Sequence, residues 1–338
     1  MSAATPPALT RKDFQTDQDV RWCPGCGDYS ILAAIQKTFP ELGIPREKFA
    51  IVSGIGCSSR FPYYMNTYGF HTIHGRPFPV ATGLKAAQPD LHVWVVTGDG
   101  DALSIGGNHL MHTLRRNVDL RILLFNNRIY GLTKGQYSPT SELGKKTRST
   151  PSGSIDPPVH PIRFALGCGA TFIARSIDRE PKHMVEVFHR AAKHRGSAFV
   201  ELYQNCNIFN DGAFQLFTEK DTKAHHVLPL AHGEPLVFGR EHEYAVVHEG
   251  FQLRVVKSAD VGDDRIVRHD EHGPLAYLHA LTELEDDPDH PVSAIGVLRA
   301  VDAPVWDELL HAQVESAIER QGPGDLQALL TGTDTWTV

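Results

Sequence analysis

Three absences narrow the function of this 338-residue chain before any motif is considered. No run of 18 apolar residues occurs, so no membrane-spanning helix is expected. Residues 1–14 lack the apolar core of a signal peptide, and we therefore expect a cytoplasmic protein. No long run of Lys or Arg appears and the net charge is −7, which argues against nucleic acid or an anionic membrane as the main partner.

Cysteine is scarce, and the five residues of this type are Cys23, Cys26, Cys57, Cys168 and Cys206. In a cytosolic protein such thiols are more often metal ligands or buried side chains than disulfides. Cys23 and Cys26 form one C-x-x-C pair, whereas Cys57 and Cys206 are single residues that each follow a predicted strand. We expect Cys168 to be a small buried hydrophobic residue.

Two polar clusters follow two apolar runs in the middle of the chain. Val93–Val96 leads into Gly98-Asp99-Gly100, and Ile122–Phe125 leads into Asn126-Asn127. This order predicts a strand, a glycine turn, a helix and a second strand. Ligands of open α/β sheets bind beyond the carboxyl ends of the strands, so we expect both clusters to face one crevice.

The residue types of this crevice suit a magnesium-bound diphosphate. Asp99 and Asn127 offer oxygen ligands, and Mg²⁺ is usually held by one or two protein groups together with phosphate oxygens. Gly98 and Gly100 allow the backbone to approach a phosphate, and the helix that follows directs N–H groups toward it. Gly-Asp-Gly, then 25 residues, then Asn-Asn resembles the fingerprint of thiamine diphosphate sites. The alternative, for Gly-Asp-Gly alone, is a plain turn capped by Asp99.

The remaining patterns predict an α/β fold with a mainly parallel sheet flanked by helices. Apolar runs and helical spacing predict further elements, with strands at 49–53, 170–174 and 198–203 and helices at 30–39, 79–88 and 184–192. A break at Pro40 is expected to end the first of these helices. No internal repeat occurs.

We divide the chain into an N-terminal arm over residues 1–20, a main domain over 21–210 and a C-terminal α+β extension over 211–338. The extension carries no chemistry that the sequence reveals. Its patterns predict a hairpin around Glu249-Gly250, a strand at 292–297 and a helix at 305–320.

The four cysteines other than Cys168 are expected to converge. In a parallel sheet, Cys57 and Cys206 lie at the same edge as the diphosphate crevice. Together with Cys23 and Cys26 they offer four thiolates, a set that suits zinc or an iron–sulfur cluster. A structural zinc site and unligated thiols stay open as alternatives. One pair with two single ligands, so close to the thiamine crevice, favours the iron–sulfur cluster.

Taken together, these motifs resemble the β subunits of 2-oxoacid:ferredoxin oxidoreductases, and among them the 2-oxoglutarate type. The resemblance is strong over residues 20–215 and loose in the tail. It rests on WCPGCGDYSIL, SGIGCSSRFPYY, HGRPFPVATGLKAAQPD, GDGDALSIGGNHLMHTLRRNVDL, LFNNRIYGLTKGQYSPTS and the late Cys206. It implies a thiamine diphosphate-binding fold and oxidative decarboxylation of a 2-oxo acid with coenzyme A, which gives an acyl-CoA, CO₂ and reduced ferredoxin.

The resemblance also implies roles for individual residues. One [4Fe–4S] cluster would be ligated by Cys23, Cys26, Cys57 and Cys206. Mg²⁺ would be held by Asp99, Asn127 and the carbonyl of Ile129. The thiamine diphosphate would be lined by Ile55, Gly56, Cys57, Ser58, Gly100, Asp101, Gly131 and Leu132. His74 would lie over the cofactor.

The motifs contain no glutamate that could activate the aminopyrimidine of thiamine. The resemblance assigns that side of the cofactor to an α subunit with a pyrimidine-binding domain, in an (αβ)₂ assembly, so we expect the chain alone to be inactive. Lys134 follows the Gly131-Leu132 loop, and as a buried cation it would pair with the distal carboxylate of 2-oxoglutarate. The alternative for Lys134 is a solvated side chain in a loop.

Other functions stay open. The same chemistry may be directed at pyruvate or branched 2-oxo acids. A non-oxidative thiamine-dependent decarboxylase or carboligase explains the diphosphate motif but leaves four cysteines without a role. A zinc-stabilised interaction module explains the cysteines but not the diphosphate motif.

Overall fold

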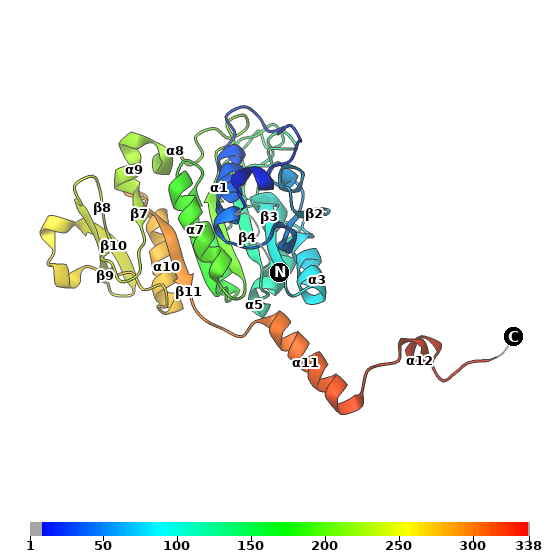
Figure 1. Ribbon diagram of the computed structural model, residues 1–338. Helices are drawn as coiled ribbons and strands as arrows, with labels where there is room; N and C mark the ends of the chain where they lie inside the picture. The colour runs from blue at the N-terminus through cyan, green and yellow to red at the C-terminus, as the bar shows by residue number, and fades with distance from the viewer. Residues whose placement is uncertain (1–8, 337–338) are drawn as a thin grey trace, which may run out of the picture.

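An eight-stranded sheet forms the centre of the computed structural model, which describes residues 9–336 (Figure 1). Its strand order is β2-β1-β3-β4-β6-β5-β11-β7, and every pair is parallel except β5 with β11. The strands are β1 (Phe49–Ser53), β2 (Tyr68–His71), β3 (His92–Gly98), β4 (Arg121–Asn126), β5 (Phe172–Ile177), β6 (Ala198–Tyr203), β7 (Val227–Pro229) and β11 (Ser293–Ala300). A second, antiparallel sheet contains β8 (Val237–Phe238), β9 (Tyr244–Glu249) and β10 (Gln252–Lys257).

Helices cover both faces of the main sheet. They are α1 (Asp28–Glu41), α2 (Phe61–Tyr64), α3 (Pro77–Ala87), α4 (Asp99–Leu103), α5 (Gly107–Arg116), α6 (Pro161–Gly167), α7 (Pro181–Lys193), α8 (Gln215–Thr218), α9 (Lys220–His226), α10 (Leu275–Glu283), α11 (Trp306–Gln321) and α12 (Leu326–Thr331). None of the helices within residues 9–336 combines the length and the apolar character that a membrane crossing requires.

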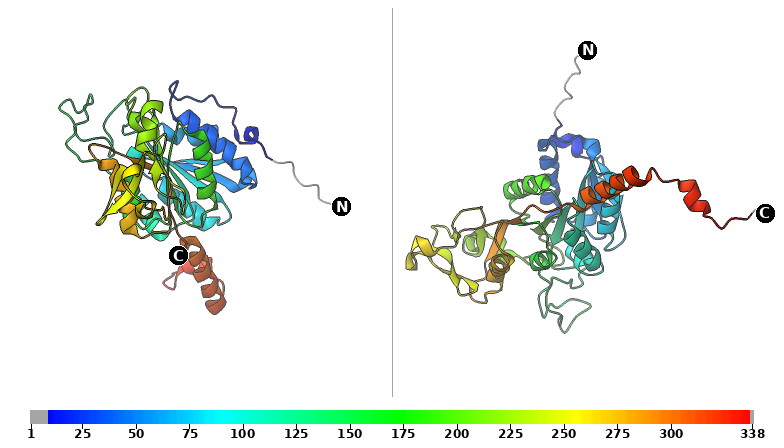
Figure 2. Two further views of the ribbon diagram at one scale, coloured as in Figure 1. Left: turned by 90° about the vertical axis from the view of Figure 1, so that its left-hand side faces the viewer. Right: turned by 90° about the horizontal axis from the view of Figure 1, so that it is seen from below.

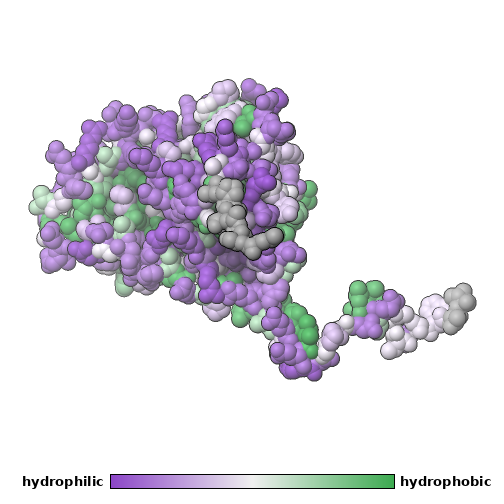
Figure 3. Space-filling view, in the orientation of Figure 1, coloured by the Kyte–Doolittle hydropathy of each residue, from purple (hydrophilic) through white to green (hydrophobic). Residues whose placement is uncertain are grey.

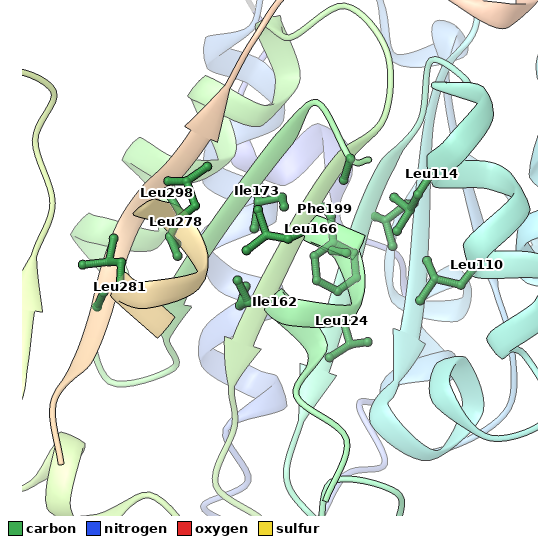
Figure 4. Packing of buried hydrophobic residues seen from close by; sticks show 14 of the residues in the cluster. Leu110, Leu114, Leu124, Ile162, Leu166, Ile173, Phe199, Leu278, Leu281 and Leu298 are labelled. Carbon is green, nitrogen blue, oxygen red and sulfur yellow. The ribbon is translucent and has the colours of Figure 1, made fainter. Parts of the chain in front are cut away.

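Successive residues of the central strands pack into two different apolar clusters, one on each face of the sheet. On one face the strands meet α3, α5, α6 and α10, and Figure 4 shows Leu124 and Phe199 among residues of α5 and α6. On the other face they meet α1 and α7. A strand that is buried on both sides needs apolar residues at every position, which is why β1, β3, β4 and β6 read as continuous apolar runs.

Most predicted elements are present, and the fold class is confirmed. Two local expectations are wrong. The helix expected directly after Gly98-Asp99-Gly100 is interrupted, because α4 ends at Leu103 and α5 begins at Gly107. The interruption lets the backbone of Gly75 approach Gly106 so closely that a Cβ on Gly75 would lie 2.5 Å from the Gly106 nitrogen. In addition, α1 includes Pro40 in its last turn instead of ending before it.

The segment after residue 211 contributes to the main sheet as well as forming the small one. β11 pairs with β5, and β7 pairs with β11 at the edge of the sheet. The proposed boundary at residue 211 therefore divides the sequence without dividing the sheet. The last two helices, α11 and α12, extend away from the rest of the chain in all three ribbon views (Figures 1 and 2).

A buried ion network ties this late segment to the older strands of the sheet. Arg175 of β5 donates from Nε to Glu201 of β6 at 2.7 Å and from Nη1 to Glu285 at 2.8 Å. The Tyr203 hydroxyl donates to Glu285 at 2.7 Å, and Ser293 of β11 accepts a bond from Arg175 at 3.0 Å. The two carboxylates hold the pKa of the buried Arg175 guanidinium above its ordinary value.

We predict that Arg175→Ala lowers the free energy of unfolding by about 3–5 kcal/mol, because it leaves buried carboxylates without their counter-ion. The matched control is Arg179→Ala, whose exposed pair with Glu219 contributes about 0–1 kcal/mol. Urea denaturation of both variants measures the difference. Equal unfolding midpoints for the two variants would contradict a stabilising role for the network.

Candidate functional site

The residues predicted for thiamine diphosphate and magnesium line one cavity at the carboxyl ends of β1, β3 and β4. This cavity measures about 50 Å³ and is lined by Ile55, Gly56, Cys57, Ser58, His74, Gly98, Asp99, Gly100, Asp101, Asn127, Ile129, Tyr130, Gly131, Leu132 and Thr133. A larger cavity of about 590 Å³ shares Ile55, Gly56 and Leu132 with it. The two together form a crevice across the sheet edge, where ligands of parallel sheets bind.

Asp99 is held in place by two hydroxyl groups from a distant loop. Ser138 and Thr140 donate to its Oδ2 atom at 2.5 Å and 2.6 Å. Burial raises the pKa of this carboxyl, while the two hydroxyls act in the opposite direction. No side-chain donor within residues 9–336 bonds to Oδ1, so a hard cation in the cavity would find a carboxylate oxygen there. A cation would also stabilise the charged form that burial disfavours.

The two consecutive asparagines have different partners. Asn126 is buried, and its Nδ2 donates to Glu201 at 2.8 Å while its Oδ1 accepts from Thr140 at 3.0 Å. Asn127 lines the cavity and donates from Nδ2 to Gln204 at 2.8 Å. This bond fixes the amide so that Oδ1 is its remaining acceptor face. Only the second asparagine is therefore placed to supply a metal ligand, together with Asp99 and the carbonyl of Ile129.

Asp101 joins three loops of the crevice. Its Oδ1 accepts bonds from the backbone N–H of Gly75 at 2.8 Å, from the backbone N–H of Ile55 at 3.1 Å and from His74 Nδ1 at 2.8 Å. Its Oδ2 accepts from the Thr97 hydroxyl at 2.7 Å. With four protein donors already bound, the Asp101 carboxylate positions the loops around the cavity. His74, whose side chain is 42% exposed, reaches the cavity from one of these loops.

Gly100 is required because Tyr130 lies against its backbone. A Cβ on Gly100 would be 2.1 Å from the Tyr130 ring, and the Tyr130 hydroxyl donates to the Gly100 carbonyl at 3.1 Å. The glycine that the sequence assigned to phosphate approach therefore also accommodates an aromatic side chain. Tyr130 itself was not among the predicted site residues.

The four predicted cluster ligands line a second cavity of about 230 Å³ next to the crevice. They are Cys23, Cys26, Cys57 and Cys206. Cys57 and Cys206 meet at Gly131, where an added Cβ would lie 3.6 Å and 3.4 Å from their respective sulfur atoms. Trp22 donates to the Cys57 carbonyl at 2.7 Å, which fixes the loop that carries this thiol. Cys168 is outside the cavity and packs at the edge of an apolar cluster, as expected for a hydrophobic role.

The surroundings of these thiols disfavour free thiolates. Burial raises the pKa of Cys57 to about 12 and also raises the pKa values of Cys26 and Cys206. Asp28, buried beneath the C-x-x-C turn, adds repulsion to both Cys26 and Cys57. Four inward-facing thiols without a nearby compensating cation are suited to a metal centre, because coordination itself deprotonates the ligands.

Lys134 differs from its predicted placement. We expected a buried cation near the thiamine crevice, but the Lys134 side chain is exposed and borders the cysteine cavity. Its backbone has a left-handed φ of 74° in the turn closed by its N–H and the Gly131 carbonyl. Arg60, which the sequence reasoning missed, borders both the cysteine cavity and the 590 Å³ cavity. Its place three residues after Cys57 was the available signal.

Two other contributors were also missed. Gln204 joins the two cavities, because it accepts from Asn127 and donates from Nε2 to Cys26 Sγ at 3.3 Å. Ser138 and Thr140 bind Asp99 from beyond the predicted loop. No motif marks these positions, since their partners lie far away in the sequence.

Comparisons with known proteins agree with this site. Residues 54–202 match the family described as thiamine pyrophosphate enzymes, C-terminal TPP binding domain. The chain is 56% identical over 331 residues to the 2-oxoglutarate oxidoreductase subunit KorB of Mycobacterium tuberculosis, a match that spans 97% of this chain and 88% of that one. It is 46% identical over 198 residues to the β subunit of 2-oxoacid:ferredoxin oxidoreductase 1 of Aeropyrum pernix, spanning 59% and 62% of the two chains.

One solved structure is similar over nearly the whole length. It is described as 2-oxoglutarate:ferredoxin oxidoreductase from Magnetococcus marinus with 2-oxoglutarate, coenzyme A and succinyl-CoA bound. The TM-score is 0.74 at 34% identity, and the match covers 97% of each chain.

We predict that Gly100→Ala weakens thiamine diphosphate binding, because the new Cβ displaces Tyr130 from the cavity wall. An overpacking cost of about 1–3 kcal/mol corresponds to a loss of roughly 5- to 150-fold in affinity. The matched control is Gly107→Ala, where an added Cβ meets nothing within 4 Å. Calorimetric titration of the cofactor into both variants measures the effect, and unchanged affinity in Gly100→Ala would contradict the assigned packing.

Proposed function

The chain belongs to the β subunits of 2-oxoglutarate:ferredoxin oxidoreductases, and from this premise we propose how its two cavities work together. With an α subunit, it would convert 2-oxoglutarate and coenzyme A into succinyl-CoA and CO₂, and pass electrons through one [4Fe–4S] cluster to ferredoxin. The membership confirms the family predicted from the motifs. The thiamine diphosphate-binding domain of that family spans both halves of the crevice.

One observation carries the proposal of a redox reaction. Cys57, Asn127, Gly131 and Leu132 line the thiamine crevice and the cysteine cavity at the same time. Bound thiamine diphosphate supplies an electron sink for decarboxylation, Mg²⁺ neutralises the diphosphate, and a bound cluster accepts single electrons. A shared wall between the two cavities supports electron transfer over a short path. A non-oxidative decarboxylase or a zinc-stabilised interaction module would not need this juxtaposition.

The residues of this chain position groups more than they transfer protons. Asp99, Asn127 and the Ile129 carbonyl would hold Mg²⁺, and Asp101 would keep the three surrounding loops in register. Cys23, Cys26, Cys57 and Cys206 would hold the cluster. Gln204 would orient a magnesium ligand and a cluster ligand at once through its two hydrogen bonds.

The lining of the crevice supports the need for an α subunit. Among the residues that line its two cavities, the acidic side chains are aspartates, and no glutamate of residues 9–336 takes part. The buried Glu201 lies behind Asn126 and is engaged by Arg175. We therefore propose that the glutamate for the aminopyrimidine comes from the α subunit in an (αβ)₂ assembly.

Substrate choice is proposed to involve the cations at the junction of the cavities. Arg60 and Lys134 both border the cysteine cavity, and Arg60 also faces the larger part of the crevice. A distal carboxylate, which 2-oxoglutarate has and pyruvate lacks, would find complementary charge there. The 2-oxoglutarate, coenzyme A and succinyl-CoA bound to the Magnetococcus enzyme support this substrate over pyruvate or branched 2-oxo acids.

The proposal predicts that Cys206→Ala in the co-expressed enzyme loses most of its iron, its acid-labile sulfide and ferredoxin reduction. Removing one of four thiolates leaves the cluster without a complete ligand set. Cys168→Ala is the matched control and should keep all three properties. Iron and sulfide analysis under anaerobic conditions measures the outcome. A colourless, zinc-loaded wild-type protein, or an unaltered cluster in Cys206→Ala, would refute the assignment.

Lys134→Ala is expected to lower kcat/KM for 2-oxoglutarate relative to 2-oxobutyrate by roughly fivefold, because an exposed charge pair contributes up to about 1 kcal/mol. Lys146→Ala removes the same charge from an exposed loop position and serves as the control. Steady-state assays with both substrates measure the ratio. An unchanged ratio would assign the distal carboxylate to another residue, with Arg60 tested next.

A further inference from the structure

The C-terminal arm, defined as residues 306–336, exposes an apolar surface that no other part of residues 9–336 covers. Leu326, Leu329 and Leu330 lie at helical spacing on α12 and are 68%, 78% and 74% exposed, and Trp336 is 84% exposed. Figures 1 and 3 show the arm extending from the body with apolar atoms along α11 and α12. A short helix is marginal in water without tertiary packing, so this surface requires a partner.

The first turn of α11 is firmly attached to the body, which fixes the direction of the arm. Asp307 is buried and accepts the backbone N–H of Asp119 at 2.9 Å. Glu308 binds Arg195 with both carboxylate oxygens, at 2.8 Å and 2.7 Å. The arm therefore leaves the body in a set orientation instead of hanging from a loose linker.

A surface groove elsewhere on the chain has matching chemistry. This groove, of about 540 Å³, lies where β7 forms the edge of the main sheet, between α9 and β8. Its apolar wall consists of Ala224, Val227, Pro229, Val237, Phe238 and Ile295. Figure 3 shows green atoms gathered over the region where Figure 1 places β7 to β10. The short edge strand offers an open sheet edge, a common place for a second chain to dock.

The charges of the arm and the groove are complementary. Four arm carboxylates have no ion-pair partner within residues 9–336, and they stand against one arginine, Arg320: Glu315, Glu319, Asp325 and Asp334. The groove is bordered by one carboxylate and four basic side chains: Glu180, His183, Lys220, Lys223 and His242. Opposite charges around an apolar contact favour one orientation of docking and disfavour others.

We propose that the arm of one copy docks in the groove of a second copy, and that the second arm docks in the first groove. The arm cannot serve its own groove, because Figures 1 and 2 show it leaving the body on the side away from β7 and β8. Reciprocal contacts of one surface with another close a two-fold symmetric pair without leaving a free arm. The apolar face of α12 then covers the exposed edge at β7, and the carboxylates of the arm face Lys220 and Lys223.

Photo-crosslinking in the assembled holoenzyme tests the docking directly. We expect p-benzoylphenylalanine in place of Leu329 to give an adduct between two β subunits, mapped by mass spectrometry to the groove segments around residues 220–242. The same probe in place of Ala328, on the opposite side of α12, should give little of this adduct. An adduct with the α subunit, an adduct within one β subunit or an adduct elsewhere on β would overturn the proposal.

The mass of the assembly gives a second, independent readout. Leu329→Asp combined with Leu330→Asp should halve the mass measured by light scattering, and Lys220→Glu should shift it in the same direction. Turnover per active site should stay unchanged, because the arm and the groove lie away from the crevice. Lys146→Glu, an equal charge reversal outside the groove, should keep the full mass. Full mass in both the arm and the groove variants would refute reciprocal docking, whatever the outcome for the catalytic proposal.

Discussion

The parallel pairing of β1, β3, β4 and β6 is the constraint on which both cavities depend. Its register places Ser53 opposite Val96, Gly98 opposite Phe125, and Asn126 opposite Tyr203. The residues just beyond these positions therefore emerge side by side at one sheet edge, although they are widely separated in the sequence. Sheet geometry thus assembles an oxygen-rich crevice and a sulfur-lined cavity next to each other.

Two buried aspartates at the start of α4 divide the work of organising that edge. Asp101 spends its acceptor capacity on four donors of the protein and so fixes the loops that carry Ile55, His74 and Gly75. Asp99 binds two hydroxyls with one oxygen and retains the other for a ligand. Burial disfavours the charge of Asp99, so a bound cation would complete a site that the protein leaves electrostatically unfinished.

The sequence revealed the parts of the fold that short-range patterns determine. Strands buried on both faces produce apolar runs, and the polar residues that follow them mark the ligand edge, which is why the lining residues were predicted together. The break between α4 and α5 was not predictable in this way, because it depends on the backbone of Gly75 approaching from another loop. The same reason hid Gln204, Ser138 and Thr140. Lys134 was misplaced because no periodicity fixes which way a side chain points from a glycine-rich turn.

Gly131 shows how closely the two cavities are coupled. It lies in the loop after β4, lines both cavities and stands within contact distance of Cys57 and Cys206. A larger residue there would occupy the wall that the crevice and the cysteines share, and would push the two centres apart. Gln204 adds a polar link across the same wall, from Asn127 to Cys26. Cofactor chemistry and electron removal would therefore be coupled through one loop and one amide, so that a change at either cavity is felt at the other.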